Sequence, residues 1–157
     1  MLDLFADAEP WQEPLAPGAT ILRRFALSRA AALFDGIDTV TARSPFRHMV
    51  TPGGYTMSVA MTNCGELGWA TNERGYVYAA NDPLTDRPWP PMPEAFQALC
   101  HDAAVAAGYP DFRPDACLIN RYAVGAKLSL HQDKDEPDLR APIVSVPLGL
   151  PPVFPFG

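Results

Sequence analysis

The stretch NRYAVGAKLSLHQDKDEPD, residues 120–138, decides the fold of this chain. Its middle part, KLSLHQ (127–132), alternates apolar and polar residues, which is typical of a β-strand. On such a strand His131 and Asp133 point to the same side, as two ligands of one metal ion must. An imidazole and a carboxylate suit Fe(II), Mn(II) or Zn(II). The pair is therefore a candidate metal site.

The spacing of His131 and Asp133 is a weak signal by itself, because a solvated acidic turn with a surface histidine has the same spacing. The preceding strand adds to it. Asn120 and Tyr122 share one face there, and a tight hairpin turn at residues 124–125 would bring that face beside His131. An amide and a phenol next to a metal can hydrogen-bond a co-substrate that carries a carboxylate. A polar pair at a sheet edge is the alternative interpretation.

Length and composition limit the class of protein. The chain has 157 residues, 48% of them hydrophobic and 19% charged, which indicates one globular domain rather than a disordered chain. No apolar run approaches the roughly 18 residues that span a bilayer, and the acidic N-terminus does not resemble a signal peptide. Its three cysteines form no CxxC pair, so we expect a cytoplasmic protein with reduced thiols: Cys64, Cys100 and Cys117.

The net charge of −6 argues against a protein that coats nucleic acid by charge alone. It leaves a local basic path open, because arginines gather in residues 23–47 while the preceding segment is acidic. Whole-chain charge therefore does not decide the partner.

Periodicity predicts two helices and a set of antiparallel strands. The first helix should start after Ser28 as its N-cap and run to Arg43. The second should have Pro93 near its first turn and end at Gly108. Residues 10–18 should form an extended arm, and the strands are expected at 19–25, 56–63, 75–79, 116–123, 127–132 and 142–150. This is an α+β layout in which the sheet carries the chemistry.

The block 120–138, together with PFRHMVTPGGYTMSVAMTNCGELGW (45–69) and PDACLINRY (114–122), resembles the AlkB family, its bacterial members in particular. These are Fe(II)- and α-ketoglutarate-dependent dioxygenases that demethylate alkylated DNA and RNA bases. The resemblance covers the whole chain. It implies a single domain, 1–157, with a double-stranded β-helix (jelly-roll) core. About 1–90 would form an N-terminal extension and nucleotide-recognition lid, and about 91–157 the first part of the core.

The resemblance also implies roles for individual residues. His131 and Asp133 would bind the iron, and O2 would be the second co-substrate. The α-ketoglutarate pocket would be formed by Asn120, Tyr122, Leu118, Leu128, Ile143 and Ser145. The damaged base would lie against Trp69, Tyr76 and Met61 with Asp135 near its polar edge, and the phosphates would meet Ser129, Thr51, Lys127 and Lys134. The implied partner is alkylated single- or double-stranded DNA, with RNA also open, and we expect a monomer that does not bind membranes.

The aromatic content of residues 46–89 supports such a lid on physical grounds. An enzyme that acts on a base must take it out of the stack and hold it between flat side chains. Most large aromatic residues are nevertheless buried for packing. We therefore expect four of these aromatics in the core: Phe46, Tyr55, Tyr78 and Trp89.

The family places a third iron ligand, a histidine, and two arginines that grip α-ketoglutarate beyond the HxD motif. After Asp133 this sequence has no histidine, and Arg140 is its only arginine. Pro147 and Pro155 fall in expected core strands, where proline removes ladder hydrogen bonds. We therefore expect a chain that is incomplete at its C-terminal end and a poor enzyme alone. Two alternatives stay open: an Fe(II)/α-ketoglutarate oxygenase for another substrate, and an inactive nucleic-acid-binding module.

Overall fold

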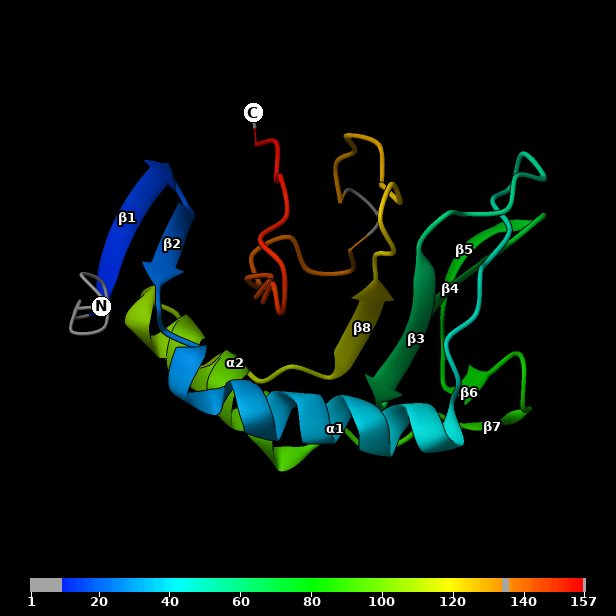
Figure 1. The fold of residues 1–157 in the computed structure, drawn as a ribbon, viewed down its shortest axis with the longest axis horizontal. Helices are drawn as coiled ribbons and strands as arrows, with labels where there is room; N and C mark the ends of the chain where they lie inside the picture. Colours follow the sequence, from blue (N-terminus) through cyan, green and yellow to red (C-terminus); the bar gives the residue numbers. More distant parts are fainter. Residues whose placement is uncertain (1–9, 134–135, 157) are drawn as a thin grey trace, which may run out of the picture.

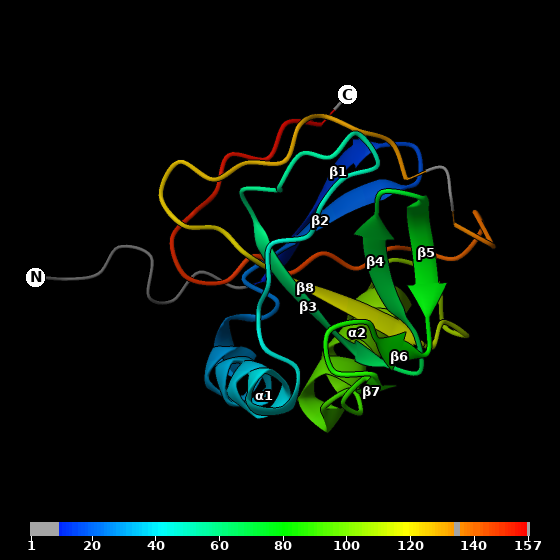
Figure 2. The ribbon, with the colours of Figure 1, turned by 90° about the vertical axis from the view of Figure 1, so that its right-hand side faces the viewer.

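The computed structural model describes residues 10–133 and 136–156. In this part of the chain, two helices lie side by side beneath the strands, as Figures 1 and 2 show from two directions. The strands are β1 (Trp11–Ala16), β2 (Ala19–Arg23), β3 (Ala60–Gly65), β4 (Gly68–Asn72), β5 (Gly75–Ala79), β6 (Asn81–Asp82), β7 (Arg87–Pro88) and β8 (Ala116–Arg121). The helices are the short 3-10 turn η1 (Leu27–Arg29), α1 (Ala30–Arg43) and α2 (Glu94–Ala106).

The strands pair two by two in antiparallel fashion, as β1–β2, β3–β8, β4–β5 and β6–β7. Helices beside antiparallel strands agree with the α+β layout that the sequence predicts. Within the described residues these two-stranded sheets do not close into a barrel. None of the helices described is long and apolar enough to cross a membrane.

Both predicted helices are present, but the start of the first differs from the prediction. Ser28 lies inside η1, and α1 begins after Arg29, which makes no side-chain capping hydrogen bond. The predicted cap is wrong because a 3-10 turn already holds this backbone through a hydrogen bond from Arg29 N–H to Ala26 O. The second helix follows the prediction: Pro93 precedes its first residue, and Gly108 ends it with a φ of +94°.

One face of the β3–β8 pair packs on the helices and forms the larger core. Cross-strand partners share a face, and Cys64 pairs with Cys117 while Thr62 pairs with Ile119. The buried members of this core are Leu33 and Val40 of α1, Cys64 of β3, Met92, Phe96 and Leu99 in and before α2, and Ile119 of β8. The core therefore anchors β3 and β8 from below and leaves their other face for a second layer.

That second layer is a smaller apolar group, which we call the methionine cluster: Met49, Val59, Met61 and Ala70, with Met57, Trp69, Ala126 and Leu128 packed against it. Met61 is only 1% exposed and pairs with Asn120 across the sheet. The cluster thus joins β3, β4 and the segment after β8. It brings predicted lid residues next to the strand that precedes the histidine.

The strands predicted at 127–132 and 142–150 do not form, and these two predictions are wrong. Residues 126–133 and 142–148 have no strand ladder, although the turn at 124–125 is present and Gly125 has a φ of +84°. Alternation alone does not make a strand, because the ladder requires a hydrogen-bonded neighbour on at least one side. Residues 142–148 still alternate in burial, and Val146 and Leu148 pack on the helix-side core.

Candidate functional site

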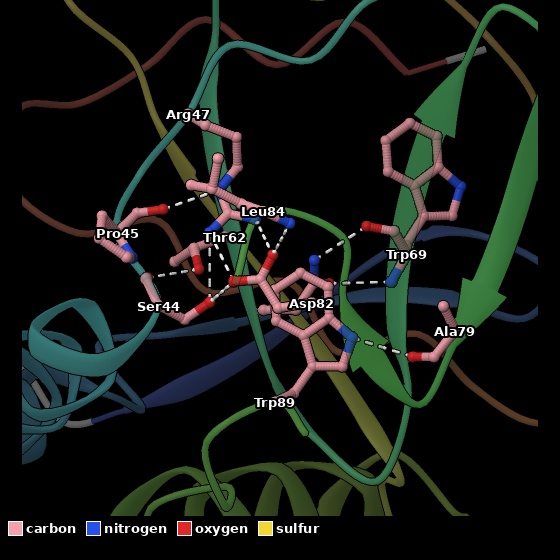
Figure 3. A network of polar contacts seen from close by, with 10 residues as sticks. Ser44, Pro45, Arg47, Thr62, Trp69, Ala79, Asp82, Leu84 and Trp89 are labelled. Atoms are coloured by element: carbon pink, nitrogen blue, oxygen red, sulfur yellow. Dashed lines mark hydrogen bonds and ion pairs between the residues drawn. The ribbon is translucent and has the colours of Figure 1, made fainter. Parts of the chain in front are cut away.

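Trp69 is held in place by a buried amide. The Asn63 side chain, which is 0% exposed, donates to the Trp69 carbonyl oxygen at 2.8 Å and accepts from the Trp69 N–H at 3.0 Å. Figure 3 shows the backbone of Trp69 with these two contacts and its ring turned away from the buried network. Two hydrogen bonds from one amide fix the start of β4 and therefore the direction of the indole.

The base of the lid is fixed by a second buried group around Asp82, drawn in Figure 3. Arg47 donates to both Asp82 oxygens, at 2.6 and 2.7 Å, and the Ser44 hydroxyl also donates to this carboxylate. The Leu84 N–H adds a bond of 2.8 Å. Burial alone would raise the pKa of Asp82, but these donors outweigh it and lower the pKa. These hydrogen bonds hold the segment that follows α1 against β6.

The β4–β5 hairpin presents an aromatic face. Trp69 pairs with Tyr78 and Thr71 pairs with Tyr76, so these side chains lie on one side of the hairpin. The rings of Trp69 and Tyr76 are stacked, with centroids 5.5 Å apart and planes inclined by 23°. Tyr76 is largely exposed. We call Trp69, Tyr76 and Tyr78 the aromatic face.

A hydrogen bond links the aromatic face to the segment that carries the metal candidates. The Tyr78 hydroxyl donates to Glu136 Oε1 at 2.7 Å, across 58 positions of sequence. Burial and this bond raise the pKa of Tyr78, and the negative charge of Asp133 raises it further. Asp133 and Glu136 therefore both lie near the hairpin. Tyr78, which the sequence places in the core, instead joins the lid to the HxD segment.

The two metal candidates lie together, although no strand holds them. His131 Nε2 is 3.6 Å from Asp133 Oδ1, and both side chains are more than half exposed. His131 Nδ1 lies 2.8 Å from the Ser129 carbonyl oxygen. Because a carbonyl only accepts, Nδ1 must donate, and Nε2 is the ring nitrogen that lies near Asp133.

The predicted α-ketoglutarate residues divide into two groups. Leu118 and Asn120 share the β8 face that looks away from the helices, and Tyr122 follows the strand on the same alternation. All three are exposed, and so are Ile143 and Ser145. Leu128 differs, because it packs against the methionine cluster.

The predicted phosphate contacts that the structure describes lie in loops, outside the strands. Thr51 accepts a hydrogen bond from the Tyr55 N–H at 3.2 Å in a hairpin loop. The backbone of Lys127 bonds both ways with the Ser58 hydroxyl, at 3.2 and 3.3 Å, and Ser129 is exposed. Lys134 and Asp135 lie outside the described residues.

The aromatics that were expected in the core fall into three classes. Trp89 is buried, donates its indole N–H to Ala79 O at 2.9 Å and confirms the expectation. Phe46 packs on the helix-side core but stays partly exposed. Tyr55 is 77% exposed at the tip of the loop after Thr51, so the expectation for it is wrong. A tight turn at Pro52–Gly54 leaves its ring without a neighbouring layer.

A hollow of about 510 Å³ opens elsewhere, between α1 and β8, and Arg121 and Phe46 are among its lining residues. The Arg121 guanidinium lies 4.5 Å from the centroid of the Phe46 ring. No predicted site residue lines this hollow. The candidate site is therefore the open face formed by β8, the aromatic face and the HxD segment.

The comparisons with known proteins agree on one family. The family model described as the 2OG-Fe(II) oxygenase superfamily matches residues 18–157. The alpha-ketoglutarate-dependent dioxygenase AlkB of Escherichia coli (strain K12) is 73% identical over 157 residues, which is 100% of this chain and 73% of that protein. The chain belongs to the AlkB family of 2OG-Fe(II) oxygenases. It is thus an Fe(II)- and α-ketoglutarate-dependent dioxygenase that uses O2.

More distant relatives support the same fold. An AlkB homolog of Caulobacter vibrioides (strain NA1000 / CB15N) is 43% identical over 131 residues, covering 83% of this chain and 58% of that protein. The solved structure of OsALKBH1 matches with a TM-score of 0.65 at 26% identity and covers 80% of this chain. The chain spans 62% of that structure. This likeness gives the chain the jelly-roll dioxygenase fold.

The HxD pair fits part of the iron site that this family requires. Two ligands about 2.1 Å from one ion and at right angles to it are about 3.0 Å apart, close to the 3.6 Å found between His131 and Asp133. The bond from His131 Nδ1 to a carbonyl is the support that metal-binding histidines usually have. Among the described residues, no group of three or more His, Cys, Asp or Glu side chains gathers around an ion position.

Proposed function

We propose that this dioxygenase removes alkyl groups from N-alkylated bases of DNA, with RNA as a second candidate. Each turnover on a methylated base would couple decarboxylation of α-ketoglutarate to hydroxylation of the methyl carbon and release of formaldehyde. The observation that carries the proposal is the placement of the stacked Trp69–Tyr76 pair beside the HxD segment, linked to it by the Tyr78–Glu136 hydrogen bond. A flat aromatic surface next to a metal pair suits a flipped base better than a small polar substrate.

His131 and Asp133 would hold the Fe(II). Bound Fe(II), with α-ketoglutarate and O2, supplies the oxidation of the alkyl carbon. The part of this chain is to orient the ligands: the Ser129 carbonyl fixes the imidazole so that Nε2 remains available at the metal side. The neighbouring Asp133 adds the negative charge that a divalent cation requires.

Asn120 and Tyr122 would bind the carboxylates of α-ketoglutarate. Asn120 lies on the exposed side of β8 and Tyr122 follows the strand on the same alternation, with Leu118 on the same face to contact the methylene groups. Burial raises the pKa of Tyr122, so its phenol remains a hydrogen-bond donor at neutral pH. Ile143, Ser145 and Leu128 would complete the pocket as the family resemblance implies.

The target base would stack on the aromatic face, close to Met61 of the methionine cluster. The position of Trp69 is supported by the Asn63 amide, so the stacking surface is ordered before the base arrives. Asp135 would read the polar edge of the base, and Thr51, Ser129, Lys127 and Lys134 would contact the flanking phosphates.

Product release tests this proposal. The chain is incubated with Fe(II), α-ketoglutarate and an oligonucleotide that carries one N-methylated base, and formaldehyde and succinate are measured. We expect both products only with the methylated oligonucleotide. A comparison of matched single- and double-stranded oligonucleotides shows which of the two forms is the better substrate. Equal succinate release with methylated and unmethylated oligonucleotides would indicate an oxygenase for another substrate. Formaldehyde release from small methylated compounds, and not from the oligonucleotide, would indicate the same.

A further inference from the structure

The three cysteines, which the proposed chemistry does not use, lie close to one another on the helix side of the molecule. Cys64 of β3 and Cys117 of β8 are direct cross-strand partners, and all three thiols are free. Cys64 belongs to the buried core, and Cys117 packs against the same core from the neighbouring strand. Cys100 of α2 lies near both, because it raises the pKa of Cys64 and its own pKa is raised by burial and by Cys117.

The geometry of the strand pair places Cys64 and Cys117 within reach of a covalent bond. Residues directly opposite in an antiparallel pair have Cβ atoms about 4.5–5.5 Å apart, and a disulfide needs about 3.5–4.5 Å. The two thiols are near enough for each to shift the pKa of the other. A shift of about 1 Å, shared by two side chains, would close the remaining distance.

The environments of the two thiols differ in a way that suits stepwise oxidation. Cys64 is 0% exposed, whereas Cys117 is only partly buried. The neighbouring Cys64 thiol lowers the pKa of Cys117 despite burial, whereas Cys117 and burial raise the pKa of Cys64. A thiolate is the form that reacts with oxidants. Cys117 is thus the accessible, reactive member, and Cys64 is the resolving member behind it.

We propose that Cys64 and Cys117 form a reversible, peroxide-sensitive thiol pair on the helix side of the co-substrate strand β8. The Cys117 thiolate attacks one oxygen of hydrogen peroxide, the O–O bond breaks, and hydroxide leaves to give a sulfenic acid. The Cys64 sulfur then attacks the Cys117 sulfur, and the S–O bond breaks as water leaves. Two thiols lose two electrons and two protons, and one peroxide becomes two water molecules.

The product would be a cross-strand link between β3 and β8, the strands whose other face carries Met61 and Asn120. A metal site does not explain the three cysteines better than a thiol pair does, because no group of three or more potential ligands gathers in the part of the chain that the structure describes. The inference does not depend on the proposed substrate, since it concerns the opposite face of the sheet.

Peptide mapping after oxidation tests the pair. The folded chain is treated with a small excess of hydrogen peroxide, free thiols are alkylated under denaturing conditions, and the protein is cleaved at aspartate without reduction. Cleavage at Asp82 and Asp102 separates Cys64, Cys100 and Cys117 into different peptides. We expect a Cys64–Cys117 linked peptide lighter by two hydrogens than the sum of its parts, removed by dithiothreitol.

Three variants and one control define the outcome. Cys100→Ser should still form the link, whereas Cys64→Ala should stop the reaction at an oxidised, unlinked Cys117, and Cys117→Ala should protect Cys64 from peroxide. Oxidation of the chain in denaturant should yield mixed pairings, which shows that the fold selects the link. A Cys100–Cys117 link in the folded chain, or Cys64 and Cys117 both alkylated while Cys100 is oxidised, would overturn the proposal.

Discussion

Replacement of Trp69 by leucine separates base stacking from the other tasks of the site. Trp69 is partly buried against the methionine cluster and stacks on Tyr76 with a centroid distance of 5.5 Å. Leucine keeps apolar contact with the cluster, so the fold should remain, but it removes the flat surface on which a base would lie. The backbone bonds to Asn63 are unaffected, because they use the main chain of residue 69.

The expected size of the effect follows from the stacking energy. A base stacked on an aromatic side chain contributes about 1–3 kcal/mol. Since about 1.4 kcal/mol is tenfold in affinity, the Kd for a methylated oligonucleotide should rise about 5- to 150-fold. Affinity for α-ketoglutarate should change little, because its proposed residues lie on β8 and in the segments after it, and not on the β4–β5 hairpin.

Fluorescence anisotropy with a labelled, methylated oligonucleotide, without oxygen so that no turnover occurs, measures this Kd directly. The matched control is Trp11→Leu, which removes an exposed tryptophan from β1, far from the aromatic face in Figure 1. The control should bind like the unchanged protein. If Trp69→Leu binds the oligonucleotide normally, or loses α-ketoglutarate affinity to the same degree, Trp69 is a packing residue and the stacking argument fails.

Three further changes test the support of the lid. Asn63→Leu should weaken oligonucleotide binding and lower the unfolding free energy by about 1–3 kcal/mol, because the Trp69 backbone loses both partners; normal stability in urea would contradict this. The lowered pKa of Asp82 stabilises the fold above a pH of about 3.9. This stabilisation is lost as the pH falls through the folded-state pKa, so the stability advantage of the unchanged protein over Asp82→Asn should shrink in acid. A constant difference in unfolding free energy from about pH 7 to about pH 3 would refute it. Gly68→Ala places a methyl carbon 2.3 Å from the Trp89 ring and should cost about 1–3 kcal/mol, seen as a lower thermal midpoint; an unchanged midpoint would show that the ring moves freely.

The sequence predicts the helices better than the strands after β8. Pro93 and Gly108 mark the ends of α2 through local backbone preferences, which do not depend on distant residues. The alternating segment 127–132 has the right local pattern but no hydrogen-bonded neighbour in the described chain. Pattern fixes which side chains share a face, whereas the ladder depends on another part of the chain.

The site residues that sequence reasoning missed act through long-range contacts. Asn63 resembles any polar strand residue until its amide is seen to bind the Trp69 backbone. Tyr78 was expected in the core because buried tyrosines are common, yet its hydroxyl reaches Glu136, 58 positions away. The expectation that Tyr55 lies in the core is wrong for a different reason: an aromatic residue in a tight turn has no neighbouring layer to cover its ring. The position of Tyr78 opposite Trp69 follows from the pairing of β4 with β5, which the sequence analysis did not predict.

Metal binding by the HxD pair tests the central claim most directly. Mn(II), which suits the same oxygen and nitrogen ligands as Fe(II), gives an electron paramagnetic resonance signal when free, so titration counts the bound ions without turnover. We expect one ion per chain, with affinity at least about tenfold weaker in His131→Ala and in Asp133→Asn. Asp138→Asn, which changes an exposed carboxylate of the same segment that pairs with Arg140, should bind like the unchanged protein. Equal binding by all four proteins would show that the ion is held elsewhere, and the account of the site would be wrong.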